Sequence, residues 1–185
     1  VCRTWLEPIE ERRNLLFVNN KDNTFTEAAA QYGLDDRSAS QHANFFDFDL
    51  DGDLDCYILN HPVDFKNMNT LDAVAGNARQ QAPRNAYESD RLLRNDRGKF
   101  VDITTPSGCS NRAFGLSTLA SDFNDDGRPD LFVGNDFVMP DFLYLNLKKA
   151  GQSSASFSDQ AEQYFRHSSN HTMGSDFADL NRDGC

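Results

Sequence analysis

The sequence predicts an all-β fold assembled from repeated four-stranded units, and two observations support this class. An aspartate-rich frame, D-x-[DN]-x-D-G-x-x-D, occurs at residues 47–55 and 122–130, and a third copy begins at Asp179. After each complete frame come three short runs of aliphatic, aromatic and β-branched residues, bounded by Asn or Asp. Four strands per repeat are typical of the blades of a β-propeller.

The repeated frame predicts a loop that binds a hard cation. Oxygen donors at positions 1, 3 and 5 converge on one ion if the backbone coils tightly, and the glycine at position 6 allows that turn through a positive φ. Position 7 varies between the copies, as expected if its backbone carbonyl is the ligand. The predicted calcium ligands are Asp47, Asp49, Asp51, Asp53 and Asp55 in the first loop, Asp122, Asn124, Asp126, Arg128 and Asp130 in the second, and Asp179, Asn181 and Asp183 in the third.

Two other interpretations of the frame compete with a calcium loop between strands. An EF-hand requires a bidentate acid at position 12, where this chain has Ile58 and Val133, so the helix-loop-helix interpretation fails. An acidic Asx-turn that binds nothing suits a single D-x-D-G better than a repeated frame. The repetition therefore favours calcium.

The strand-like runs give the order of each unit. The frame joins a first strand to a second one, at 54–60 or 129–135, and third strands are expected at 91–95 and 142–146. Fourth strands are expected at 99–104 and 156–160, with a matching run at 24–28.

This strand order divides one propeller domain into an incomplete ring of about two full blades and two partial ones. The expected parts are an N-terminal segment at 1–14, the outer half of a blade at 15–34, a blade at 38–108, a blade at 112–166, and the inner start of a further blade at 171–185.

The two complete units differ in length because the first carries an insertion at residues 61–90. Insertions in repeat folds map to loops on one face, often the face that binds a ligand. Within it, residues 70–79 have a weak helical pattern that Gly76 interrupts.

These motifs resemble the FG-GAP/VCBS β-propeller repeats and, among them, the ASPIC/UnbV family related to cartilage acidic protein. The segments that carry the resemblance are residues 16–20 with 23–27, the three aspartate loops, 134–137 and 173–181. The resemblance implies a seven-bladed, integrin-α-like ring with calcium in its inter-strand loops. It also implies an exported protein, located outside the cell, in the periplasm or at the cell surface, that serves adhesion or ligand binding.

The composition excludes several classes of partner. The formal net charge is -11, with 29 acidic against 18 basic residues, so the chain lacks the Lys/Arg excess that nucleic acids and anionic lipids require. No run of 18 apolar residues is present, which argues against membrane insertion. A protein or carbohydrate ligand is the expected partner.

Four cysteines permit three full pairings, and their spacing matches no zinc motif. Cys56 falls in a strand and is expected to be a small buried hydrophobe. Cys109 falls in a Ser-Gly-Cys-Ser turn and is expected to be more exposed. In an oxidising compartment, Cys2 and Cys109 are the favoured disulfide partners. For each of them, a partner cysteine outside this segment is the alternative.

Two functional classes fit the sequence. The favoured one is a calcium-stabilised binding or adhesion propeller without chemistry of its own. The alternative is an extracytoplasmic propeller enzyme acting on polysaccharide, a lyase or hydrolase, with Arg79, Arg84 and Tyr87 of the insertion as polar candidates. No nucleophile, base and orienting group can be aligned from the sequence, so no catalytic residue is predicted.

Overall fold

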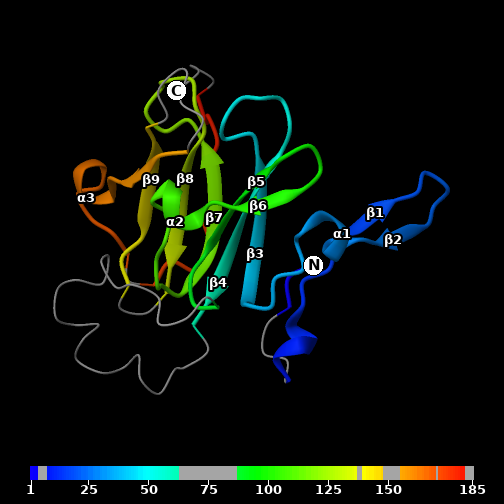
Figure 1. Ribbon diagram of the computed structural model, residues 1–185. Helices are drawn as coiled ribbons and strands as arrows, with labels where there is room; N and C mark the ends of the chain where they lie inside the picture. Colours follow the sequence, from blue (N-terminus) through cyan, green and yellow to red (C-terminus); the bar gives the residue numbers. More distant parts are fainter. Residues whose placement is uncertain (4–7, 63–86, 137–138, 148–154, 170, 182–185) are drawn as a thin grey trace.

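The computed structural model describes residues 1–3, 8–62, 87–136, 139–147, 155–169 and 171–181, and its architecture is all-β. Two four-stranded antiparallel sheets form the centre, and a two-stranded hairpin projects on the N-terminal side (Figure 1). Each four-stranded sheet is a meander in which neighbours in sequence are neighbours in space. The predicted unit of four consecutive strands is therefore confirmed.

Both sheets follow the predicted strand order. The first sheet consists of β3 (Ala39–Phe46), β4 (Asp55–His61), β5 (Arg91–Asn95) and β6 (Phe100–Asp102). The second consists of β7 (Gly115–Ser121), β8 (Asp130–Asn135), β9 (Phe142–Asn146) and β10 (Phe157–Asp159). The aspartate loops connect β3 to β4 and β7 to β8, so both lie between a first and a second strand, as predicted.

The two sheets also share their register. Ser40 pairs with Asn60 in the first sheet, and Gly115 pairs with Asn135 at the equivalent place in the second. A register shift follows directly after each pair. Equal pairing in both sheets means that the aspartate loops start from equivalent backbone positions.

The N-terminal part contains a 3₁₀ turn, η1 (Ile9–Arg12), and a hairpin of β1 (Phe17–Asn19) and β2 (Phe25–Glu27). A one-turn helix follows the last strand of each unit: α1 (Ala29–Tyr32), α2 (Thr104–Ser107) and α3 (Ala161–Tyr164). In each case an acid two residues earlier, Glu27, Asp102 or Asp159, accepts the first helical N–H. These short helices were not predicted from the sequence, because a single turn has too few residues to show a helical period.

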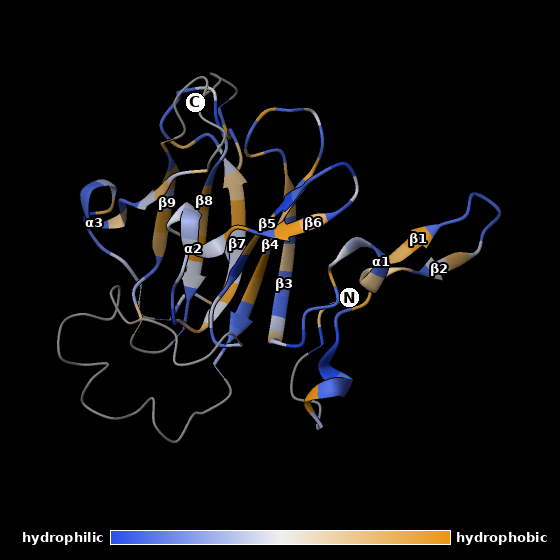
Figure 2. Ribbon diagram, viewed as in Figure 1, coloured by the Kyte–Doolittle hydropathy of each residue, from blue (hydrophilic) through white to orange (hydrophobic). Residues whose placement is uncertain are grey.

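Three apolar layers alternate with the sheets, and the smallest, with Leu143 and Leu145, lies on the outer face of the second sheet. The main core lies between the two sheets and includes Tyr57, Leu59 and Leu131. A second layer, with Cys56 and Ile58, lies between the first sheet and residues of the segment 15–34. Because side chains alternate along a strand, β4 contributes to both layers and is buried at all seven positions. Figure 2 shows hydrophobic colour on β4, β8 and β9, whereas β3 and β7 are paler or hydrophilic and the connecting loops are mostly hydrophilic.

The contact between the two sheets is repeated on the far side of the second sheet. A Cβ atom at Gly115 would lie 2.6 Å from Cγ of Leu59, so β7 packs closely on β4. At the equivalent positions one unit later, a Cβ atom at Gly134 would lie 2.5 Å from Cγ2 of Thr172. In each contact a glycine faces a branched side chain. The glycine is on β7 in the first contact and on β8 in the second.

Residues 171–177 accordingly lie against β8 in the way that β7 lies against β4. The Thr172 N–H donates to the Asn135 carbonyl at 2.9 Å, and the hydroxyls of Ser117 and Ser175 are 2.8 Å apart. The described residues of 171–181 contain no strand. That they begin a further blade, and that the sheets close into a ring, stay predictions.

The exposure predicted for Cys109 is wrong. Its side chain is 0 % exposed and belongs to the core between the sheets, because the chain turns inward after α2. Cys56 is buried, as predicted. Cys2, Cys56 and Cys109 are free thiols, and Cys185 lies outside the described residues.

The inserted length is found where it was expected, between β4 and β5. Residues 62–90 separate these strands, whereas residues 136–141 separate β8 from β9. The predicted helical pattern at 70–79, Arg79 and Arg84 lie outside the described residues. Tyr87 is described and is 40 % exposed. None of the helices in the described ranges has the length and apolar character needed to cross a membrane.

Candidate metal site in the aspartate loops

The backbone of both loops coils as the frame predicts. The glycine at position 6 has a positive φ in each, 94° at Gly52 and 82° at Gly127. Position 4 is also left-handed, at Leu50 and Asp125. With left-handed residues at positions 4 and 6, the N–H groups of positions 5 and 6 point toward the acid at position 1.

Position 1 organises this turn through hydrogen bonds. Asp47 accepts the N–H groups of Asp51 and Gly52 at 3.1 and 3.0 Å. Asp122 accepts the equivalent pair at 3.0 and 2.7 Å. These bonds reach four and five residues along the chain, whereas the two-residue reach of an Asx-turn occurs at position 5, where Asp51 accepts the Asp53 N–H and Asp126 accepts the Arg128 N–H. Each carboxylate oxygen at position 1 keeps a second lone-pair direction, so these hydrogen bonds are compatible with a cation at the same acid.

Position 9 fastens each loop to the third strand of its sheet. Asp55 is 1 % exposed, and its two oxygens accept the N–H groups of Phe48 and Asn95 at 3.1 and 2.8 Å. In the second loop Asp130, which is 0 % exposed, makes the same two bonds at 3.0 and 2.7 Å, with Phe123 and Asn146 as donors. The acid at position 9 is thus a structural clamp in both loops as well as a predicted ligand.

The asparagines that end the third strands were missed as site residues. The Asn95 amide donates to the Leu54 carbonyl at 3.1 Å, and the Asn146 amide donates to the Pro129 carbonyl at 3.2 Å. They close the base of each loop from behind. The signal was present in the sequence, because both predicted third strands, at 91–95 and 142–146, end in Asn.

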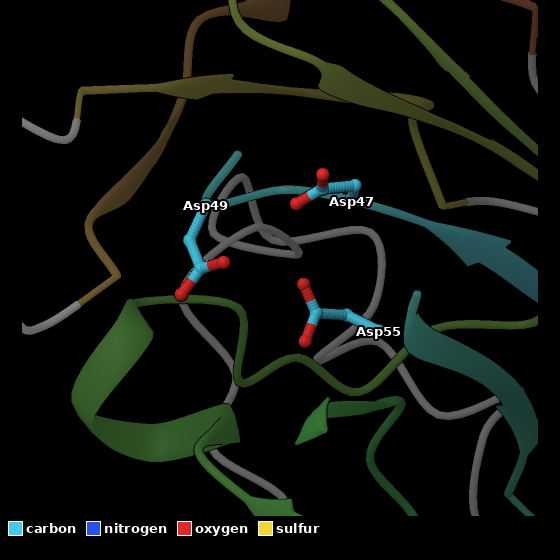
Figure 3. A group of neighbouring side chains, drawn as sticks. All are labelled: Asp47, Asp49 and Asp55. Carbon is cyan, nitrogen blue, oxygen red and sulfur yellow. The ribbon is translucent and has the colours of Figure 1, made fainter. Parts of the chain in front are cut away.

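In the first loop, three predicted ligands come together. One oxygen each of Asp47, Asp49 and Asp55 lies within 4.8 Å of the other two, and Figure 3 shows the three carboxylates turned toward a common space. Calcium binds oxygen at 2.3–2.6 Å, so two ligands of one ion lie at most about 5 Å apart. The spacing of this cluster therefore fits a calcium ion.

The other two acids of the first loop occupy different positions. Asp51 accepts the N–H of Asp53 at 3.1 Å and lies on the exposed outer turn rather than in the cluster. One side-chain oxygen of Asp53, Oδ1, is buried without a hydrogen-bond partner among the described residues. A buried carboxylate oxygen without a donor is what a nearby cation would satisfy.

Burial, together with neighbouring negative charge, raises the pKa values of Asp55 and Asp53. Burial raises the pKa of Asp55 to about 7, and the charges of Asp49 and Asp53 add to the rise, while its two N–H donors oppose it. The pKa of Asp53 is raised by desolvation and by the charges of Asp51, Asp49 and Asp47. A divalent cation at the cluster would favour the ionised forms and reverse these shifts.

The second loop keeps the backbone but not the charge. The Arg128 guanidinium donates to Oδ2 of Asp126 at 2.6 Å and to the Asn146 carbonyl at 3.1 Å. The amide of Asn124 donates to the same oxygen of Asp126 at 3.0 Å. Oδ2 of this position-5 carboxylate therefore already has two donors. Within the described ranges only the first loop brings three acids together.

The third copy of the frame is described in part. Asp179 and Asn181 lie in an exposed segment after residues 171–177, and Asp183 lies outside the described residues. Among the residues that the structure describes, Asp179 and Asn181 are not part of an acidic cluster.

These features define a class: a repeat protein of four-stranded antiparallel sheets with an aspartate-rich loop in the first turn of each unit. Residues 122–185 match the model of the FG-GAP-like repeat family. The match begins at the first acid of the second loop and supports the FG-GAP repeat family, as the motifs predicted. FG-GAP repeats suggest a β-propeller-like module for ligand binding. No curated protein matches the chain.

Proposed function

We propose that this chain is part of an exported, calcium-stabilised β-propeller of the ASPIC/UnbV type. In this proposal the module binds a protein or carbohydrate ligand and has no catalytic role. The observation that carries it is the cluster of Asp47, Asp49 and Asp55, held in a loop whose backbone is repeated in the next sheet.

The donor set favours calcium over other metals. The cluster offers carboxylate oxygens alone, which suit hard cations, whereas zinc prefers His and Cys ligands. Magnesium requires a near-ideal octahedron of ligands at 2.0–2.1 Å. A turn with backbone carbonyls and flexible acids at 2.3–2.6 Å suits calcium better.

The expected role of the ion is to hold the first hairpin of the unit. Asp47 directly follows β3, and Asp55 is the first residue of β4, so one ion would join the facing ends of both strands. Extracellular calcium modules bind at about 10⁻⁴ to 10⁻³ M, so filling the loop requires an exported compartment rich in calcium.

Calorimetric titration with calcium, compared between Asp49→Asn and Asp125→Asn, tests the proposal. Asp49 belongs to the cluster. Asp125 is an exposed acid at position 4 of the second loop, where the frame has no fixed residue. Asn tolerates the positive φ of this position. We expect Asp49→Asn to lose binding at the first loop, together with a stabilisation of about 1.4 kcal/mol at calcium ten times its dissociation constant.

The Asp125→Asn control should bind like the parent protein. No heat of binding at millimolar calcium in the parent protein would refute the calcium role. Equal loss in both variants would mean that the loops attract cations by overall charge alone.

A further inference from the structure

The first three residues are fixed beside the first sheet by backbone hydrogen bonds. The amino group of Val1 donates to the Leu15 carbonyl, and the Leu15 N–H returns a bond to Val1 at 3.0 Å. On the other side of Cys2, the Arg3 N–H donates to Asn14 Oδ1 at 3.1 Å. Cys2 is therefore held between two anchored neighbours.

Asn14 connects this segment to the sheet. Its side-chain amide donates to the hydroxyl of Ser40 at 2.8 Å, and that hydroxyl donates to Oδ1 of Asn60 at 2.7 Å. All three side chains are at most 5 % exposed. The position of the N-terminal segment on β3 and β4 is thus set by a buried polar chain.

Cys2 and Cys56 line the same apolar cleft. Leu16, Leu34 and Ile58 form part of its wall, between the N-terminal segment and the outer face of the first sheet. Cys56 is 1 % exposed, and Cys2 is partly exposed. Cys109 belongs to the core on the opposite face of the sheet, so β4 and its neighbours lie between it and Cys2.

The electrostatics agree with this proximity. Burial raises the pKa of the Cys56 thiol to about 12, and the charge of Cys2 is the next largest cause. Burial also raises the pKa of Cys2, but the N-terminal ammonium opposes the rise. Because Cys2 is partly exposed and Cys56 is buried, Cys2 is the thiol that an oxidant in solution reaches first.

We propose that Cys2 and Cys56 form a disulfide in an oxidising compartment and so attach the N-terminal segment covalently to β4. The inference rests on the exported location within the proposed function. It replaces the pairing of Cys2 with Cys109 favoured from the sequence.

The oxidant is a small disulfide such as oxidised glutathione. The Cys2 thiolate attacks it, a mixed disulfide forms, and one glutathione thiolate leaves. Cys56 then loses its proton and attacks the Cys2 sulfur, which releases the second glutathione thiolate. Two protein thiols are oxidised, and one glutathione disulfide is reduced to two thiols once the leaving thiolates take up the two protons.

Tryptic mapping without reduction tests the pairing in the full chain after incubation with oxidised and reduced glutathione. Cleavage after Arg3 frees the peptide that contains Cys2, and cleavage after Lys66 ends the peptide that contains Cys56. We expect these two peptides to be joined. We also expect reduction to lower Tm by roughly 5–10 °C, since the bridge closes a long loop.

Serine variants provide matched controls. Cys2→Ser should abolish the joined peptide, whereas Cys109→Ser should keep it. Cys2→Ser replaces a partly exposed thiol with a hydroxyl of similar size, so we expect this variant to fold. Linkage of Cys2 to Cys109 or Cys185, or glutathione retained on Cys2 in the parent protein, would overturn the proposal. Calcium binding is measured separately, so failure here leaves the metal site untouched.

Discussion

The two aspartate loops share a backbone and differ in charge. Their glycines have the same positive φ, their first acids accept the same pair of N–H groups, and their last acids make the same clamp. The first loop has five carboxylates at its odd positions, whereas the second has Asn124 and Arg128 in place of two of them. Only the first assembles a three-acid cluster among the described residues.

This difference separates the backbone of the loop from its charge. The hydrogen bonds of positions 1 and 9 are made in both loops, although the residues at positions 3 and 7 carry different charges. In the second loop the guanidinium of Arg128 neutralises Asp126 from within. In the first loop the equivalent residue is Asp53, which adds a negative charge, so an external cation has more to stabilise.

The largest effect is expected from removing the clamp. Asp55→Ala and Asp130→Ala each leave two backbone N–H groups without their acceptor, which costs about 3–4 kcal/mol of the free energy of unfolding. In the presence of calcium, Asp55→Ala should lower the free energy of unfolding more than Asp130→Ala does, because Asp55→Ala also removes a predicted calcium ligand. Chemical denaturation with calcium and with a chelator measures both.

The chelator condition is the control for this pair. Without calcium the two variants should be alike, since their clamps are equivalent. If the two variants differ in free energy of unfolding by the same amount with calcium and with the chelator, the loops differ in packing rather than in metal binding.

A pH dependence of about 3 kcal/mol is expected from Asp90, which lies outside the loops. Its buried carboxylate accepts hydrogen bonds from Tyr57, Asn60 and Asn111 between the two sheets. Burial raises its pKa from 3.8 to about 6. Below about pH 4 the acid is neutral in both states; as pH rises through 6 the folded state must bury a charge, so stability falls.

Asp90→Asn removes the pH dependence of stability that comes from Asp90, so the acids of the two loops can be compared without it. The variant should lose the fall in stability between about pH 4 and 6 at saturating calcium, when the loop acids are held ionised. Denaturation curves across that range measure it. An unchanged slope in Asp90→Asn would assign the pH dependence to other acids.

The smallest effect is expected from Arg128→Ala. Its carbonyl at position 7 stays in place, while removal of the guanidinium takes away a positive charge and leaves Asn124 as the side-chain donor to Oδ2 of Asp126. We expect the calcium affinity of the second loop to rise about threefold to tenfold. Asp126→Ala should lower it instead. Calorimetry that gives equal affinities for these two variants would contradict the metal role of the second loop.

The local pattern was sufficient for the strands and for the loop turn. Runs of aliphatic, aromatic and β-branched residues predicted the second, third and fourth strands of both sheets within a residue or two. The second strands are the most apolar, because a strand between two apolar layers needs apolar side chains on both faces. The glycine of each frame predicted a positive φ, since few other residues tolerate it.

The site was predicted only in part. The frame identified the acids, but spacing alone could not tell that Asp51 lies on the outer turn while Asp47, Asp49 and Asp55 converge. Nor could it show that the Arg128 side chain folds back onto Asp126, because that contact depends on the carbonyl of Asn146 in another strand.

The sequence by itself determined the repeat, the strand order and the turn chemistry, because these depend on residues close together in the chain. The tertiary structure alone decided which partners meet across the sheets. It buried Cys109, placed Cys2 beside Cys56, and set Leu59 against Gly115. Such contacts join residues dozens of positions apart, and their side chains are matched in size and polarity only after the sheets have packed.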